Sequence, residues 1–178
     1  MRNFVFVLAM LGISVAQAAT VTVDFDEFTE NNMHSPIVSD GYSFDSRAGF
    51  EPIGGIAPCP ICTLTISNVA GDPFSLLSLG LWNVELFGTG DAVVTVTGNY
   101  AVGGQVSIDL LLPASIQTDF SFDSAWSGLQ SATFSAASTG SAVGYDNVVL
   151  SAVPIPAAVW LFGSALAGLG WMRRKQTG

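Results

Sequence analysis

Val93-Val-Thr-Val-Thr-Gly-Asn-Tyr-Ala-Val-Gly-Gly-Gln-Val-Ser-Ile-Asp-Leu-Leu-Leu112 is the stretch that decides the fold. Its second half places Val106, Ile108, Leu110 and Leu112 on one face and Ser107 and Asp109 on the other. The first half alternates in the same way from Val93 to Thr97. An apolar residue at every second position is typical of a half-buried β-strand, and glycine pairs such as Gly103-Gly104 favour turns. The stretch therefore predicts two strands joined by a turn, with a further turn at Gly98-Asn99.

The same pattern continues outward along the chain. Alternating runs occur at Val21–Phe25, Thr63–Ser67 and Ala132–Ala136, and Leu76–Leu86 is apolar on both faces, which predicts a central strand. Further turn signals lie at Gly71-Asp72-Pro73, Gly88–Asp91 and Thr139-Gly140. We expect an all-β fold: eight to ten short antiparallel strands in two sheets, a jelly-roll-like sandwich over residues 19–152. Residues 31–60, rich in proline and glycine, should form long loops with one short strand at Gly41–Phe44.

Both ends of the chain resemble export signals. Met1-Arg-Asn is basic, Phe4–Val15 is apolar, and Ala16-Gln-Ala18 has the small residues that signal peptidase accepts, which predicts a signal peptide over residues 1–18. At the other end Pro154-Ile-Pro156 is followed by an apolar run, Ala157–Met172. As a helix this run spans about 24 Å, less than the ~30 Å hydrocarbon core of a bilayer. Arg173, Arg174 and Lys175 follow and should stay cytoplasmic.

Residues 153–178 resemble a known sorting domain. Val153-Pro-Ile-Pro-Ala-Ala-Val-Trp-Leu-Phe-Gly-Ser-Ala-Leu-Ala-Gly-Leu169, with the basic cluster behind it, is similar to the PEP-CTERM signal that exosortases recognise in Gram-negative bacteria. Ile155 stands where the name-giving motif has Glu, so the match is to a variant of the signal. The resemblance assigns the sorting signal to Val153, Pro154, Pro156, Trp160, Arg173, Arg174 and Lys175. A plain C-terminal membrane helix with a stop-transfer cluster is the alternative.

The charge of the mature body limits its partners. Four of the five basic residues lie in the terminal signals, so Arg47 alone faces fourteen acids between residues 24 and 146, a net charge of 1 − 14 = −13. Nucleic acid is excluded, because binding it requires the neutralisation of phosphates by Lys and Arg. Anionic polysaccharides are disfavoured for the same reason. Neutral sugars and calcium remain open.

Cys59-Pro-Ile-Cys62 is the only cysteine motif. In an exported chain it predicts a local structural disulfide. A thioredoxin-type redox site would need a helix behind the first cysteine, where the sequence predicts a strand instead. Zinc would have two thiols and the distant His34 as its ligands, which is a poor set.

Acidic residues near both ends of the body form a second candidate site. In an antiparallel sandwich the first and last strands often meet, which would bring Asp24, Asp26 and Glu27 close to Asp146. Carboxylate oxygens are the ligands that calcium prefers. The pattern resembles the structural metal site of some carbohydrate-binding jelly rolls at Asp24, Glu27 and Asp146. Solvated edge carboxylates are the alternative.

Aromatic side chains form a third candidate site. Trp82 and Trp126, with Tyr42, Tyr100 and Tyr145, could stack against sugar rings, although a sandwich core also needs large apolar side chains. The body, from Phe74 to Leu150, resembles the β-rich ectodomains found in front of PEP-CTERM signals, which are similar to lectin or carbohydrate-binding jelly rolls.

No catalytic constellation is apparent, since His34 is the sole histidine and no pair of acids is distinguished. We therefore expect a non-enzymatic protein that crosses the inner membrane, with signal peptidase and an exosortase as its processing enzymes. After processing it would reside in the surface or the exopolysaccharide matrix, or in the medium. A secreted carbohydrate-binding module is one alternative function, and a permanently membrane-anchored surface protein is another.

Overall fold

The computed structural model describes residues 19–28, 35–46, 50–52, 56–58, 63–85, 90–114, 116–136 and 141–153. Several predictions concern other residues and lie outside this part of the chain: the signal peptide with Ala16 and Ala18, the Cys59–Cys62 disulfide, His34, and the sorting signal from Pro154 to Lys175. A search of the described residues for a helix with the length and hydropathy needed to span a bilayer finds none. The described residues belong to one compact unit, Ala18–Val153.

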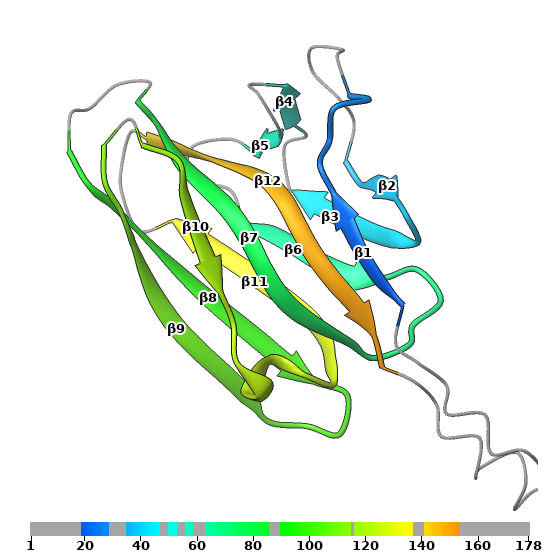
Figure 1. The fold of residues 1–178 in the computed structure, drawn as a ribbon. Helices are drawn as coiled ribbons and strands as arrows, with labels where there is room; N and C mark the ends of the chain where they lie inside the picture. The colour runs from blue at the N-terminus through cyan, green and yellow to red at the C-terminus, as the bar shows by residue number, and fades with distance from the viewer. Residues whose placement is uncertain are drawn as a thin grey trace, which may run out of the picture. The chain divides into compact units, whose positions relative to one another are not determined.

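Twelve strands and one 3₁₀ turn make up the described structure (Figure 1). The strands of the first half are β1 (Thr20–Val23), β2 (Ile37–Ser39), β3 (Tyr42–Ser46), β4 (Phe50–Pro52), β5 (Ile56–Pro58) and β6 (Leu64–Asn68). Those of the second half are β7 (Phe74–Glu85), β8 (Ala92–Tyr100), β9 (Gln105–Leu112), β10 (Thr118–Ser121), β11 (Leu129–Ala136) and β12 (Ser141–Ala152). The 3₁₀ turn η1 (Ser124–Trp126) precedes β11.

The strands form two layers. One layer has the order β9-β8-β11-β6-β3-β2, and the other has the order β10-β7-β12-β1 (Figure 1). A single pair, Leu129 with Phe74, connects β11 to β7, and the small β4–β5 hairpin joins β12 through Tyr145 and Ile56. All pairings between these strands are antiparallel. The prediction of an all-β antiparallel fold is confirmed.

The core lies between the layers, where side chains at alternate positions meet. The fully buried side chains include Leu76, Leu79 and Leu81 of β7. On β12 they include Tyr145, Val148 and Leu150. From the opposite layer Phe134 of β11 packs edge-on against Tyr145, with ring centroids 5.5 Å apart. Such edge-to-face pairs add to the stabilisation that burial of apolar area gives.

Several expectations about individual segments were wrong. There are twelve strands rather than eight to ten, and residues 31–60 contain four of them rather than one. Three of these four, β2, β4 and β5, are three residues long, too short to show an alternation. Gly98-Asn99 is not a turn but part of β8, where Gly98 pairs with both Ala132 and Val106. Leu129 occupies the space above Gly98, so the glycine serves close packing.

The first and last residues of the domain lie together. Ala152 donates a backbone hydrogen bond to Ala19 (3.3 Å), and Val153 donates one to Pro73 (3.2 Å). This end of β12 therefore pairs with the beginning of β7, while Trp82 lies near the other end of β7, opposite Gly144. The chain enters and leaves the domain at the end remote from Trp82.

Candidate functional site

The outward side of the β10-β7-β12-β1 layer carries an unusual cross-strand pair. Trp82 of β7 pairs directly with Gly144 of β12. A Cβ atom at Gly144 would coincide with the indole atoms Cδ2, Cε2 and Cζ2 of Trp82, so the ring covers the bare glycine backbone. Trp82 is half-buried, whereas Leu81 and Asn83 on either side of it are buried. The glycine therefore allows the indole to lie against the sheet surface.

A polar site lies two residues from Trp82 along β7, on the same side of the layer. Gly80 pairs with Asp119 of β10 on one side and Asp146 of β12 on the other. The position that a Cβ of Gly80 would take lies 2.8 Å from Gln117 Nε2, 3.1 Å from Asp119 Oδ1 and 3.3 Å from the carbonyl oxygen of Asp146. An amide, a carboxylate and a carbonyl thus surround a glycine about 7 Å along the strand from Trp82. We call Trp82, Gly144, Gly80, Gln117, Asp119 and Asp146 the Trp82 face.

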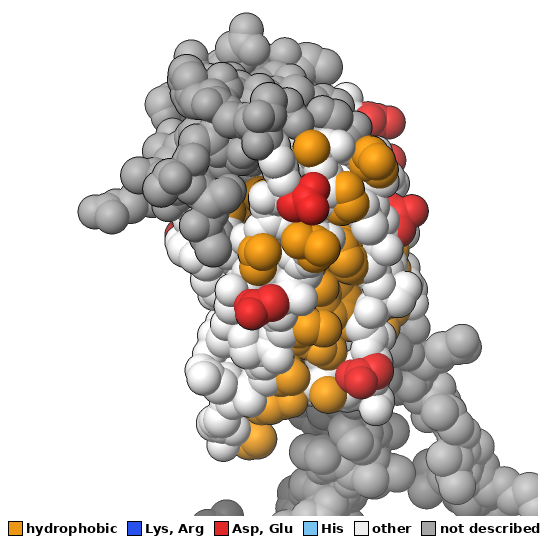
Figure 2. All heavy atoms as spheres, turned by 90° about the vertical axis from the view of Figure 1, so that its left-hand side faces the viewer, with side chains coloured by type: hydrophobic (Ala, Val, Ile, Leu, Met, Phe, Trp, Pro, Cys, Tyr) orange, Lys and Arg blue, Asp and Glu red, His pale blue; other side chains and the backbone are white. Residues whose placement is uncertain are grey.

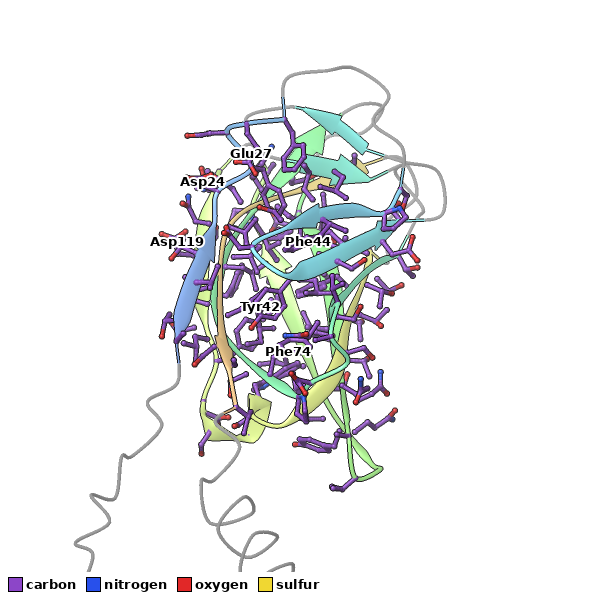
Figure 3. The ribbon with its side chains drawn as sticks, turned by 90° about the vertical axis from the view of Figure 1, so that its right-hand side faces the viewer. Asp24, Glu27, Tyr42, Phe44, Phe74 and Asp119 are labelled. Atoms are coloured by element: carbon purple, nitrogen blue, oxygen red, sulfur yellow. The ribbon has the colours of Figure 1, made fainter. Side chains whose placement is uncertain are left out.

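Negative charge gathers beside the Trp82 face. Burial raises the pKa of the Asp146 carboxyl, a hydrogen bond from the Asn147 backbone lowers it, and repulsion from Asp26, Asp24 and Asp119 raises it again. Figure 3 shows Asp24 and Asp119 on the same side of the sandwich, away from the core residues Tyr42, Phe44 and Phe74. Neither Lys nor Arg occurs in the described residues. The face therefore carries an uncompensated negative potential in that part of the chain.

Replacing Asp146 by Asn is expected to stabilise the protein at neutral pH. A raised carboxyl pKa means that the folded state binds the proton more tightly than the unfolded state, so stability falls as pH rises through that pKa. The amide that replaces the carboxyl cannot ionise, and its oxygen can still accept from the Asn147 backbone, as Asp146 Oδ1 does at 2.8 Å. The bond that the exposed Asn147 Nδ2 donates to Asp146 Oδ2 at 2.9 Å is lost, and water can replace it. We expect Tm to rise by about 1–3 °C at pH about 7 and the gain to vanish near pH 3. A gain that is equal at both pH values would contradict the electrostatic origin.

The residues predicted as calcium ligands do not assemble into one ligand group. β1 does pair with β12, with Val23 opposite Val148, so Asp24 comes near Asp146. Asp24 Oδ1, however, accepts from the Asp26 backbone at 3.3 Å, and Glu27 Oε1 accepts from Ser39 Oγ at 3.1 Å. Among the described side chains, no three of the His, Cys, Asp and Glu type converge in a way that could hold a metal ion. The positive φ of Phe25, which buries its ring, turns the chain between Asp24 and Glu27.

The aromatic residues predicted to stack on sugars separate into two groups. Trp126 is 4% exposed and packs on Phe122, with ring centroids 4.7 Å apart, so the prediction that it stacks on sugars was wrong. Tyr42 and Tyr145 are buried as well, and Tyr100 donates its hydroxyl to the Ala125 carbonyl at 2.7 Å. Trp82 is the member of the set that lies on the outward side of a layer. Sequence reasoning missed Gly80, Gly144, Gln117 and Asp119, because only strand register places them beside Trp82.

A second surface feature lies on the side of the molecule formed by β8, β9 and the approach to β10. Figure 2 shows hydrophobic side chains gathered there, with acidic side chains among them. Exposed members include Ile108 and Leu111 of β9, Val102 in the turn before it and Ile116 before β10. β9 pairs only with β8 among the described strands, so its other edge lacks a described partner. The exposed large hydrophobic side chains of the described residues are all aliphatic.

Comparisons with known proteins add no family assignment. No protein-family model matches the chain, and no curated protein matches it. Among solved structures, a variant of the family 29 carbohydrate-binding module CBM29-2 bound to mannohexaose is similar, with 15% identity, a TM-score of 0.47, and coverage of 76% of this chain and 92% of that one. A family 29 carbohydrate-binding module gives 14% identity, a TM-score of 0.48, and coverage of 76% and 89%.

The CBM22-1 xylan-binding domain of Paenibacillus barcinonensis Xyn10C gives 11% identity, a TM-score of 0.34, and coverage of 76% and 94%. Identities and TM-scores as low as these assign neither a family nor a ligand to this chain.

Proposed function

We propose that the protein is an exported, non-enzymatic glycan-binding module, and that the Trp82 face is its binding surface. The observation that carries the proposal is the indole of Trp82 lying over Gly144 on the outward side of a layer. One face of the ring packs on the backbone, and in this proposal the opposite face receives the C–H face of a pyranose ring. The proposal makes Trp82 the platform on which one sugar unit stacks.

The polar groups beside the indole supply what a sugar needs next to its apolar face. Sugar hydroxyls donate well to carboxylates, and such charge-assisted hydrogen bonds are stronger than neutral ones. Asp119 Oδ1 and Gln117 Nε2, both close to Gly80, offer an acceptor and a donor on the neighbouring rung. A few polar groups beside an apolar surface are the usual composition of a ligand site. In this proposal a sugar ring stacks on Trp82, the apolar part of the face, and its hydroxyl groups form hydrogen bonds with Asp119 and Gln117, the polar part.

Glycan binding by the purified full chain, kept in mild detergent, tests the proposal. A glycan array identifies a ligand, and calorimetry then compares Trp82→Leu with the unmodified protein. Leu keeps an apolar cover on Gly144 but removes the aromatic plane, so we expect affinity to fall by at least about tenfold. Leu111→Ala, at an exposed apolar residue on β9, is the matched control and should bind normally. Equal binding by all three proteins, or no glycan bound at all, would refute the proposal.

Gly144→Ala is expected to weaken glycan binding as much as Trp82→Leu does while the fold survives. The added methyl would occupy the place of the indole, so the ring must swing away from the sheet. Gly144 lies in a regular part of β12 paired with Trp82, and its backbone needs no positive φ, so the strand itself tolerates a side chain. We expect binding to fall to the level of Trp82→Leu with a loss of about 1–3 kcal/mol in stability. Normal affinity in Gly144→Ala would show that the indole position is irrelevant to binding.

We propose further that the glycan-binding domain is delivered by C-terminal sorting, as the resemblance to the PEP-CTERM signal implies. In support, β12 ends at Ala152 and the signal begins at Val153, at the end of the domain remote from Trp82. A tail at that end would leave the Trp82 face free during processing. The proposal includes removal of residues 1–18, oxidation of Cys59 with Cys62 after export, and recognition of Pro154, Pro156 and Trp160 by an exosortase.

The intact mass of the protein recovered from native cells tests the sorting proposal. Loss of both the first eighteen or so residues and everything beyond the Pro-x-Pro region is the expected result. A mass that retains residues 160–175 in the membrane fraction would mean that the tail is a permanent anchor. Thiol labelling of the same sample shows whether Cys59 and Cys62 are oxidised.

A further inference from the structure

The charge and geometry of the Trp82 face indicate which class of glycan it would bind. This inference rests on the proposed function. Gly80 lies on one rung between Asp119 and Asp146, so a carboxylate side chain stands on the strand at each side of it. The Cα atoms of these two acids are separated by two interstrand spacings, about 10 Å. Gln117 Nε2 and Asp119 Oδ1 occupy the space directly over Gly80, so a ligand group approaches at the edge of this cluster, where it meets the negative charge of both strands.

The aromatic half of the face independently favours a cation. Trp offers the strongest cation–π surface among the side chains, and aromatic rings are the usual recognition surface for quaternary ammonium ligands. Trp82 and Gly80 are two residues apart on β7, about 7 Å, which is within the reach of one sugar unit and its substituent. An ammonium group on a sugar stacked at Trp82 can thus reach the Asp119 carboxylate beside Gly80.

Within the described part of the chain, no basic side chain competes for these carboxylates. Asp24 and Asp26 lie close enough to raise the pKa of Asp146 by repulsion, and no Lys or Arg occurs in the described residues. The Asp119 carboxylate has two oxygens with about four acceptor positions, so it can accept from a ligand as well as from a neighbour. Gln117 Nε2, beside it, can donate to a neighbouring hydroxyl or ring oxygen.

We propose that the Trp82 face selects glycans that carry free amino groups, such as glucosamine polymers without N-acetyl groups. The sugar ring stacks on Trp82, and its ammonium group donates to the Asp119 carboxylate beside Gly80, within the negative field of Asp146, whose own oxygens accept from Asn147. An N-acetyl group would abolish the positive charge and add bulk beside the Gln117 amide. Uronate-containing chains would be repelled by the same carboxylates.

Three oligosaccharides of equal length and identical backbone test this inference, because they differ only in the group at the second carbon. They are a cello-oligosaccharide (hydroxyl), an N-acetylated chito-oligosaccharide (acetamido) and a glucosamine oligosaccharide (amino). Calorimetry on the full chain in mild detergent at low salt is expected to give at least about tenfold tighter binding of the amino oligomer. The preference should shrink as salt rises.

Charge-neutral variants separate a specific site from general attraction to an acidic protein. Asp119→Asn should remove most of the preference for the amino oligomer, and Asp146→Asn is a second, independent variant on the other side of Gly80. Asp72→Asn is the matched control, because Asp72 is exposed in the turn before β7, at the end remote from Trp82. Equal losses in Asp119→Asn and Asp72→Asn would overturn the inference, since net charge alone would then explain the preference.

The failures of the two proposals are distinguishable. If all three oligosaccharides bind equally and Trp82→Leu weakens each of them, the glycan-binding function stands and the amino selectivity is wrong. If the amino oligomer binds equally to the unmodified protein and to Trp82→Leu, the oligomer does not bind at the Trp82 face and the inference fails. If no glycan on the array or in the series binds, both proposals fail.

Discussion

Replacing Phe134 by Ala is expected to cost about 3–5 kcal/mol of unfolding free energy, among the largest losses of any single truncation in the core. Phe134 is fully buried in β11 and pairs with Leu64 of β6 on one side and Val96 of β8 on the other. Its ring also packs edge-on against Tyr145 from the opposite layer. Removing the ring therefore opens a cavity where three strands of one layer meet the other layer, and paired strands cannot collapse to fill it.

Chemical denaturation of the full chain in mild detergent measures this loss. Ser135→Ala is the matched control, because the neighbouring Ser135 side chain is exposed on the other side of the same strand, and it should change stability by less than about 0.5 kcal/mol. Phe134→Leu should lie between the two, since it refills part of the cavity. A loss below about 1 kcal/mol in Phe134→Ala would mean that the two layers do not pack through this residue.

Truncation of Trp126 to Ala is expected to cost a similar amount, about 3–5 kcal/mol. Trp126 ends the 3₁₀ turn η1, whose N-cap Asp123 accepts a hydrogen bond from the Ala125 backbone at 2.9 Å. The indole is buried and packs on Phe122, which follows β10. It therefore closes one end of the core between β10 and β11. Thermal or denaturant unfolding of the variant, compared with Trp126→Phe, measures how much of the stability depends on the indole.

The two tryptophans are expected to give opposite results in the two assays. Trp126→Phe should bind glycans normally once it is folded, whereas Trp82→Leu should lose binding and keep most of its stability, since Trp82 is only half-buried. Unfolding and calorimetry on the same preparations make the comparison. If Trp126→Phe loses glycan affinity while it remains folded, the assignment of the site to the Trp82 face is wrong.

The sequence predicted strands best where apolar and polar residues alternate over a long run. The runs from Val93 to Thr97 and from Val106 to Leu112 lie in β8 and β9, and the glycines between them form the turn, with positive φ at Gly103 and Gly104. Leu76–Leu86 was predicted as a central strand, and β7 is flanked by β12 and β10. Short strands such as β2 and β5 gave no periodic signal, because three residues contain at most one full alternation.

The Trp82 face was predictable only in part. Trp82 was identified by its residue type, but the same reasoning selected Trp126, and the sequence contains nothing that distinguishes an outward indole from a buried one. The register of β7 against β12 makes the difference, because it sets Trp82 opposite Gly144. The acids were likewise identified near both ends of the chain, and β1 does meet β12, yet Glu27 turns to Ser39 rather than to Asp146.

By itself, the sequence determined that the body is a sandwich of antiparallel strands and that it is strongly acidic, because period-two alternation and residue charge are local properties. It also determined the two terminal segments that resemble export signals. Only the tertiary structure decided which aromatic ring lies outward and which polar groups surround it. Those neighbours come from β7, β10 and β12, and a shift of one residue in strand pairing would move every one of them to the opposite face of the sheet.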